Sequence, residues 1–359
     1  MKKPFLCLAC LCLAAATVFG QTSRRYLVSP PGAEFEEGLA ASAVQFGFNN
    51  IHIQSRTQQI DNSFVGTNVP FMFQGIGWRR DGRSRPSSIK RTAELEMVMS
   101  HADFAAVGPN FAKNYKDVPR PVFTRKKVIL PDWSRAPKIA PASFDLILPF
   151  DIFFIYNRKD ALLYELVVRN LSSPQAYHMD FYRDNQLNHA FADWPAPIDA
   201  GCQMSRGRML QSCLLRVSGS TLEMMFRLWN TPASTPVHAL LGTTDPRINL
   251  PGLCATLHSN SLVTLPVRTS TAAGLVDPTK VASVPWKSWY GGATLYTQCV
   301  ALHPSLPYGV ALSSAQGCVV PKTNTRKTLP THMVWNYRSA AATGGFFDRS
   351  TCIPTLFVW

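Results

Sequence analysis

The amino-acid sequence predicts an all-β protein with two β-sandwich domains, jelly-roll-like and then Ig-like. Three observations favour this fold class. Apolar and polar residues alternate in short runs, these runs recur at intervals of about ten residues, and Pro, Gly or Asn separates them. No long stretch has the 3.6-residue period of an amphipathic helix. With 359 residues, of which 46% are hydrophobic and 16% charged, the chain is long enough for two cores and is not disordered.

The first 20 residues have the layout of a secretory signal peptide. Lys2 and Lys3 precede an almost unbroken apolar run at 5–19, and the small residue Gly20 stands before Gln21. We therefore expect cleavage before Gln21 and export to the periplasm, the cell surface or the extracellular space. The run is shorter than the roughly 20 residues of a membrane-spanning helix, and no later run approaches that length. No transmembrane segment is expected in the mature chain.

The first domain is expected over residues 21–200. Ile76 and Trp78 share one face of the run at 75–82, which predicts a strand with Trp78 in the core. Leu95, Met97 and Met99 alternate in the same way, although a brief helix at 93–99 or 187–193 is an alternative. Further strands are expected at 122–130, 144–148, 153–156 and 162–169.

The second domain is expected over residues 201–322. The Pro-rich segment at 194–197 separates it from the first domain. Its strands are expected at 214–217, 221–228, 237–242, 262–268, 294–303 and 308–313. Residues 323–359 form a basic tail that ends in an apolar, strand-like run, and Cys352 offers a disulfide that would tether this tail to the second domain.

Cysteine usage agrees with export. Removal of the leader leaves an even number of cysteines, all in the second half of the chain, so disulfides are the leading interpretation. The six disulfide candidates are Cys202, Cys213, Cys254, Cys299, Cys318 and Cys352. Six cysteines allow 15 pairings, and the sequence does not choose among them. A zinc site is not expected because no Cys-x-x-Cys pair or His cluster occurs, and no metal or cofactor is predicted.

The charge of the chain favours anionic partners. The formal net charge is +14 for the whole chain, and loss of Lys2 and Lys3 lowers it by two. A basic exported protein is attracted to anionic cell-wall polymers or polysaccharides. The basic residues are scattered and no nucleic-acid-binding module frames them, so a specific nucleic-acid partner is not expected.

Several segments together resemble a set of uncharacterised secreted proteins of planctomycete-type bacteria. The matching segments are VSPPG at 28–32, WRRD at 78–81, LEMVMS at 95–100, FAAVG at 104–108, FDLILPFD at 144–151, LLYELVVR at 162–169, ALLG at 239–242, LPGLC at 250–254, TLYTQCVAL at 294–302 and YGVALSS at 308–314. This resemblance covers most of residues 28–322. It implies export and two β-sandwich-like domains, and it implies no activity and no catalytic residues.

Motifs of common enzyme classes do not occur in the sequence. There is no Gly-x-Ser-x-Gly elbow, and the eight histidines never fall in a metal-binding pattern. A glycosidase needs two carboxyl groups that face each other across the substrate. The candidates for such a pair are Asp145, Asp151, Asp180 and Asp184. An extracellular hydrolase that acts on a polymer is therefore the alternative function, without assigned catalytic residues.

Binding of a polysaccharide is the function that the sequence favours. Trp286, Trp289 and Tyr290 lie together in a loop-like segment, and Trp133, beside Asp132 and Arg135, is a second candidate that we expect to be exposed. Flat aromatic rings with polar neighbours are suited to stacking against sugar rings. We therefore expect an exported, non-catalytic structural or adhesive protein that binds an acidic or neutral polysaccharide or cell-wall polymer through these four residues.

Overall fold

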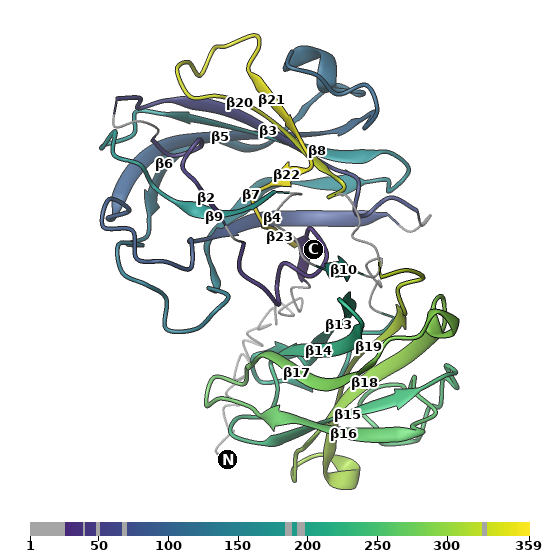
Figure 1. Cartoon of the computed structure of the whole chain (residues 1–359). Coiled ribbons are helices and arrows are strands. Elements are labelled where there is room, and N and C mark those ends of the chain that lie inside the picture. Colours follow the sequence, from purple (N-terminus) through teal and green to yellow (C-terminus); the bar gives the residue numbers. More distant parts are fainter. Residues whose placement is uncertain are drawn as a thin grey trace, which may run out of the picture.

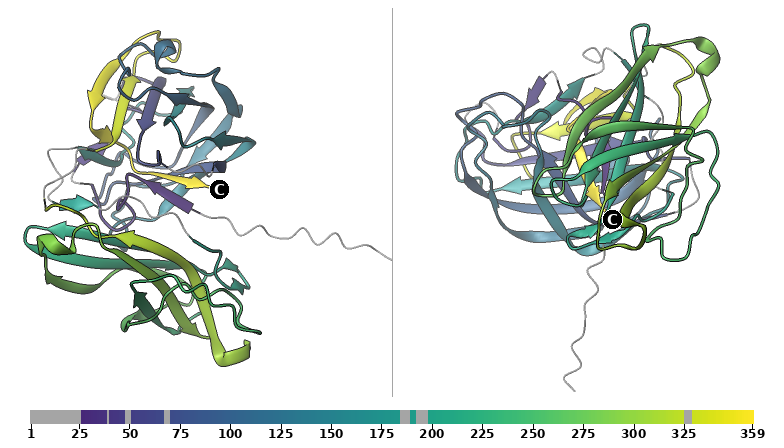
Figure 2. Two further views of the ribbon diagram at one scale, coloured as in Figure 1. Left: turned by 90° about the vertical axis from the view of Figure 1, so that its right-hand side faces the viewer. Right: turned by 90° about the horizontal axis from the view of Figure 1, so that it is seen from below.

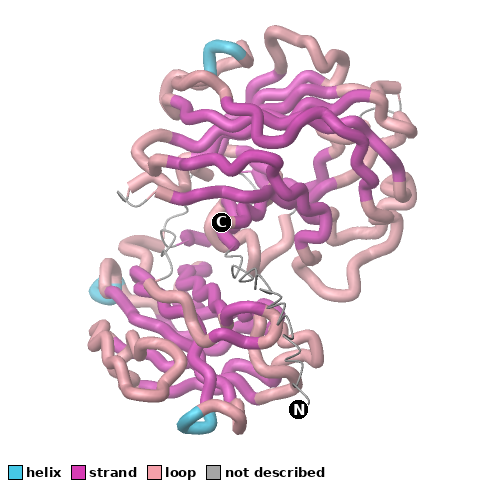
Figure 3. Tube along the Cα trace, turned by 180° about the vertical axis from the view of Figure 1, so that it is seen from behind, coloured by secondary structure: helices cyan, strands magenta, loops and turns pink. Residues whose placement is uncertain are grey.

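The computed structural model confirms the all-β fold class. It describes residues 26–38, 40–47, 51–66, 70–183, 189–191, 198–324 and 329–359. The predicted leader at 1–20 lies outside these residues. In the described part of the chain, strands dominate both bodies of the molecule, and the helical elements are short 3₁₀ turns at the periphery (Figure 3). These turns are η1 (Ala112–Asn114), η3 (Ser288–Tyr290) and η4 (Pro307–Gly309).

The first domain encloses its core between a six-stranded and a four-stranded sheet (Figure 1). The six-stranded sheet has the order β21 (Phe346–Arg349), β20 (Thr331–Asn336), β3 (Ser55–Asp61), β8 (Ala161–Arg169), β5 (Arg91–Ala102) and β6 (Arg120–Leu130). The four-stranded sheet has the order β1 (Tyr26–Ser29), β23 (Thr355–Val358), β4 (Phe71–Arg79) and β7 (Phe144–Tyr156). A smaller sheet joins β2 (Ala40–Ser42), β9 (Met179–Arg183) and β22 (Thr351–Cys352).

The predicted alternation decides which side chains of the first domain enter the core. Leu95, Met97 and Met99 of β5 are all fully buried, so residues 93–99 form a strand and not the alternative helix. Trp78 of β4 is also buried, as predicted, and its indole N–H donates to the Tyr164 hydroxyl at 3.3 Å. Two-residue periodicity therefore places the inward face of each sheet correctly.

The second domain is a sandwich of two four-stranded sheets. One sheet has the order β10 (His189–Phe191), β13 (Leu210–Ser218), β14 (Thr221–Trp229) and β17 (Val276–Pro285). The other has the order β16 (Val263–Thr269), β15 (Pro236–Gly242), β18 (Thr294–Leu302) and β19 (Val310–Val319). The short hairpin β11 (Gln203–Met204) and β12 (Gly207–Arg208) precedes β13. Inward residues of both sheets, among them Phe226 and Leu312, form a separate apolar core.

The C-terminal strands belong to the first domain, which differs from the expected division of the chain. Strand β20 pairs with β3, and β23 lies between β1 and β4, so residues 329–359 complete both large sheets. Figure 2 shows these yellow strands inside the purple and blue body. The second domain is thus inserted between two segments of the first. The expected tether to the second domain through Cys352 is wrong, because Cys352 is a buried thiol and strand pairing holds the tail instead.

An apolar interface joins the two domains. The outward residues Leu356 and Val358 of β23 belong to one buried cluster with Leu214 of β13 and Met225 of β14. The loop after β1 adds polar contacts, because the Glu34 carboxylate accepts a hydrogen bond from the Ser212 hydroxyl at 2.6 Å and Glu36 pairs with Arg216. Among the described residues, no helix has the length and apolar character that a membrane crossing requires.

Candidate functional site

Of the three aromatic residues predicted at 286–290, only Trp289 offers a large free surface. Its side chain is 77% exposed, and its ring centroid lies 4.1 Å from that of Tyr290 at an interplanar angle of 58°. Tyr290 packs against the core of the second domain, and the Trp286 indole N–H donates to the Pro321 carbonyl at 3.4 Å. The loop therefore presents one exposed ring and not a platform of three.

Trp133 is a structural residue, so its prediction as an exposed binding residue is wrong. Its side chain is only 1% exposed. The indole N–H donates to the Asp145 carboxylate at 2.9 Å, and the ring stacks on Tyr177 with centroids 4.7 Å apart. The flanking Asp132 accepts a hydrogen bond from the backbone N–H of Ser134, which forms a local turn and directs the intervening ring inward.

The predicted cysteine pairs are only partly formed. A disulfide joins Cys202 and Cys254, in the loops that precede β11 and β16. The other four predicted candidates are buried thiols: Cys213, Cys299, Cys318 and Cys352.

The carboxylates considered for a hydrolase have separate structural partners. Asp145 holds the indole of Trp133, as described above. Asp151 lies on the surface of β7, where hydrogen bonds from the side chains of Lys126 and Thr124 lower its pKa to about 2. Asp180 is buried against Arg79, and Asp184 lies outside the described residues.

Asp180 is part of a carboxylate cluster that sequence spacing did not indicate. Oxygen atoms of Glu37, Asp81 and Asp180 all lie within 4.8 Å of one another. The Arg79 guanidinium donates to Asp180 at 2.5 and 2.8 Å, and Arg85 pairs with Asp81 at 2.5 Å. Burial, and then the charge of Asp180, raise the pKa of Glu37 to about 7. Arg79 and Arg85 thus pair with two of the three carboxyl groups, and burial favours the neutral form of the third, Glu37, which describes a structural ion network.

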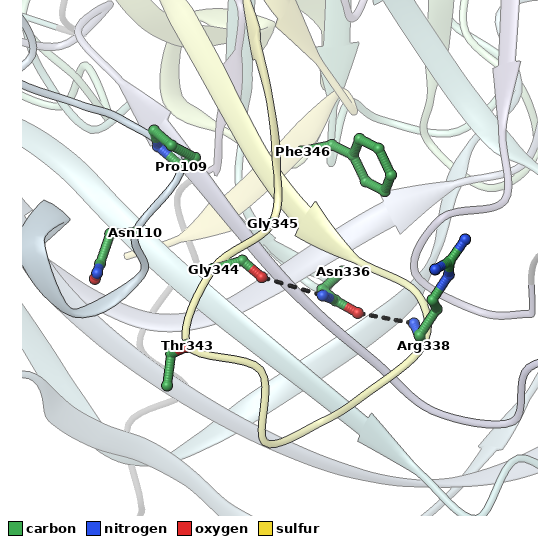
Figure 4. Close-up of a pocket in the computed structure, with 8 residues that line it drawn as sticks. All are labelled: Pro109, Asn110, Asn336, Arg338, Thr343, Gly344, Gly345 and Phe346. Carbon is green, nitrogen blue, oxygen red and sulfur yellow. Dashed lines mark hydrogen bonds between the residues drawn. The ribbon is translucent and has the colours of Figure 1, made fainter.

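A polar and aromatic surface lies at the hairpin between β20 and β21. A cleft of about 460 Å³ opens there (Figure 4). Its lining residues are Pro109, Asn110, Asn336, Arg338, Thr343, Gly344, Gly345 and Phe346. The lining carries one cation and no carboxylate.

A row of aromatic rings borders this cleft. Phe346 is 52% exposed, and its ring lies parallel to that of Tyr337, with centroids 5.7 Å apart and an interplanar angle of 2°. Trp335 lies behind Phe346 at 6.1 Å, and His52 lies beside Tyr337 at 5.2 Å. The Arg338 guanidinium lies over the Tyr337 ring at 5.5 Å. The hairpin places Trp335 of β20, Phe346 of β21 and Tyr337 of the connecting loop on the same side, and their rings stack there.

The backbone around the cleft is held by hydrogen bonds. The Asn336 side chain donates to the Gly344 carbonyl at 3.1 Å and accepts from the backbone N–H of Arg338 at 2.9 Å (Figure 4). The Gly345 N–H donates to the Pro109 carbonyl at 2.9 Å. A Cβ atom at Gly345 would lie 2.5 Å from the Trp335 carbonyl oxygen, so only glycine fits. The lining is therefore preorganised, which reduces the entropy lost when a ligand binds.

This site was not predicted from the sequence, although the strand-like C-terminal run near it was. The available signal was the density of aromatic residues on both sides of Gly344 and Gly345: Trp335, Tyr337, Phe346 and Phe347. Comparison of the chain with protein-family models, curated proteins and solved structures finds no match. The resemblance to secreted planctomycete-type proteins therefore stays a prediction.

Proposed function

We propose that the protein is an exported, non-catalytic adhesive protein that binds polysaccharide in the cleft of the β20–β21 hairpin. One observation carries the proposal. The half-exposed ring of Phe346 stacks in parallel on Tyr337 beside a cleft lined by amide, hydroxyl and guanidinium groups. Sugar rings bind proteins through this combination, because their C–H faces pack on flat rings while their hydroxyl groups need directed hydrogen bonds.

The charge of the site favours an acidic polysaccharide over a neutral one. Arg338 is the charged residue of the lining, and its guanidinium can bind a carboxylate or sulfate group through two parallel hydrogen bonds. The formal charge of +14 for the whole chain adds a long-range attraction to anionic polymers. Stacking on Phe346 and pairing with Arg338 would then act on one sugar unit and its acidic substituent.

The hydrolase alternative lacks comparable support. In the described residues, Glu37, Asp81 and Asp180 form a cluster of three carboxyl groups, and arginine side chains already pair with two of them. A glycosidase needs carboxyl groups that reach the bond to be broken.

Glycan-array screening followed by calorimetry tests the proposal. We expect the wild-type protein to bind uronate-containing or sulfated polymers, and Phe346→Ala to weaken binding up to about tenfold, since loss of a stacked ring removes up to about 1.5 kcal/mol. Arg338→Gln should weaken binding to acidic polymers more than to neutral ones.

Trp289→Ala is the matched control, because it removes an exposed ring from the other domain. We expect unchanged affinity. If Trp289→Ala abolishes binding and Phe346→Ala does not, the polysaccharide site lies on the second domain. If the intact protein binds no glycan, the proposed function is wrong.

A further inference from the structure

Three thiols lie together in the core of the second domain. Cys213 belongs to β13 in one sheet, whereas Cys299 and Cys318 belong to β18 and β19 in the facing sheet. All three side chains are buried in the same apolar cluster. This cluster therefore holds cysteines from both layers of the sandwich.

Cys213 and Cys318 are direct neighbours across the two sheets. The Cys318 thiol donates to the Cys213 carbonyl with a sulfur–oxygen distance of 3.7 Å. The adjacent Gln316 side chain accepts the Cys213 N–H at 2.6 Å, which holds β13 beside β19 at this point. Burial, and then a hydrogen bond with the Cys318 thiol, raise the pKa of Cys213. Cys299 also raises this pKa, but by an electrostatic effect without a hydrogen bond.

We propose that Cys213 and Cys318 form a second disulfide, which joins the two sheets of the second domain, while Cys299 and Cys352 remain thiols. Cys352 is excluded as a partner because it lies in the buried cluster between the two domains, whereas Cys213 and Cys318 lie in the core of the second domain. The Cys299 N–H donates to the Ser313 hydroxyl at 2.8 Å. The Cys299 thiol makes no hydrogen bond to Cys213 like the one that the Cys318 thiol makes.

The oxidant is an external disulfide. It is either oxidised glutathione or the disulfide of an oxidoreductase in the compartment to which the protein is exported. The thiolate of one cysteine attacks the external disulfide, which forms a mixed disulfide and releases one thiol. The second thiolate then attacks the protein sulfur of that mixed disulfide, which closes the Cys213–Cys318 bond and releases the second external thiol. Two protein thiols are oxidised and one external disulfide is reduced. Because burial raises the pKa of Cys213 and disfavours its thiolate in the folded core, the bond closes before the core is sealed during folding.

Differential alkylation of the full-length exported protein tests the assignment. The protein is refolded with oxidised and reduced glutathione and then denatured in the presence of iodoacetamide, which labels free thiols. It is next reduced and treated with N-ethylmaleimide, which labels the cysteines that were in disulfides. Mass spectrometry then identifies the label on each cysteine peptide. We expect N-ethylmaleimide on Cys213 and Cys318 and iodoacetamide on Cys299 and Cys352. Non-reduced digests should contain the linked Cys213 and Cys318 peptides.

Cys299→Ala and Cys352→Ala are the controls, and each should leave the linked peptide intact. Cys213→Ala should turn Cys318 into a free, iodoacetamide-labelled thiol, and this readout does not depend on native stability because labelling is done on denatured protein. Iodoacetamide on Cys213 or Cys318 of the refolded wild type, or a linkage of either one to Cys299, would overturn the proposal. Glycan binding does not enter this test.

Discussion

Replacement of Glu34 by glutamine probes the charge buried between the two domains. Glu34 lies in the loop after β1 and is fully buried. One carboxylate oxygen accepts the Ser212 hydroxyl at 2.6 Å, and the other has no hydrogen-bond partner among the described residues. Burial raises the pKa of Glu34 from 4.5 to about 7, although the Ser212 hydrogen bond and the charge of Arg227 partly oppose that rise.

The sign of the pH dependence follows from this raised pKa. The folded protein holds the Glu34 proton more tightly than the unfolded chain, so the stabilisation from this proton is complete below the unfolded pKa of 4.5 and is lost as the pH rises through 7. Each unit of pKa difference corresponds to about 1.4 kcal/mol, so the contribution of Glu34 to the free energy of unfolding should fall by about 3 kcal/mol between pH 4 and pH 8. Glu34→Gln cannot ionise and should lose this decrease.

Urea denaturation at fixed ionic strength, followed by tryptophan fluorescence at pH 5, 6, 7 and 8, measures the effect. We expect the variant and the wild type to have similar stability near pH 5 and the variant to be more stable by up to about 3 kcal/mol at pH 8. Glu37 titrates in the same range in both proteins, so it cancels in the difference. Glu94→Gln is the control, because hydrogen bonds from Asn170 and then Arg125 lower the pKa of this exposed residue. A difference between Glu34→Gln and the wild type that stays constant from pH 5 to pH 8 would refute the reasoning.

Three further predictions concern packing and strand pairing. Arg79→Met should leave Asp180 buried without its cation and lower the free energy of unfolding in urea by about 3–5 kcal/mol. A chain that ends at residue 324 loses β20 and β23, including the core ring of Phe357, so the first domain should lose its near-ultraviolet circular dichroism. Gly345→Ala forces Cβ against the Trp335 carbonyl and should weaken glycan binding, by calorimetry, as strongly as Phe346→Ala; unchanged affinity would contradict the preorganised cleft.

Local periodicity was sufficient to predict several strands and their inward faces, but it did not indicate β3, β17 or β20. Trp78 and the alternating residues Leu95, Met97 and Met99 are buried as expected, because the direction of a side chain in a strand depends only on its position along that strand. Trp133, in contrast, was expected to be exposed because of its charged neighbours and not because of periodicity, and this prediction is wrong. Its indole is buried because a distant carboxylate, that of Asp145, accepts its N–H group.

The pairing of the strands could not be predicted from the sequence. Residues 329–359 pair with strands near the start of the chain, and this pairing creates the β20–β21 hairpin with its row of rings. Glu37, Asp81 and Asp180 likewise meet only after folding. The β character, the core faces and the basic charge follow from the amino-acid sequence alone, because they depend on neighbouring residues or on composition. The division into domains, the cysteine neighbours and the cleft follow from the folded structure, because they depend on contacts between residues far apart in the chain.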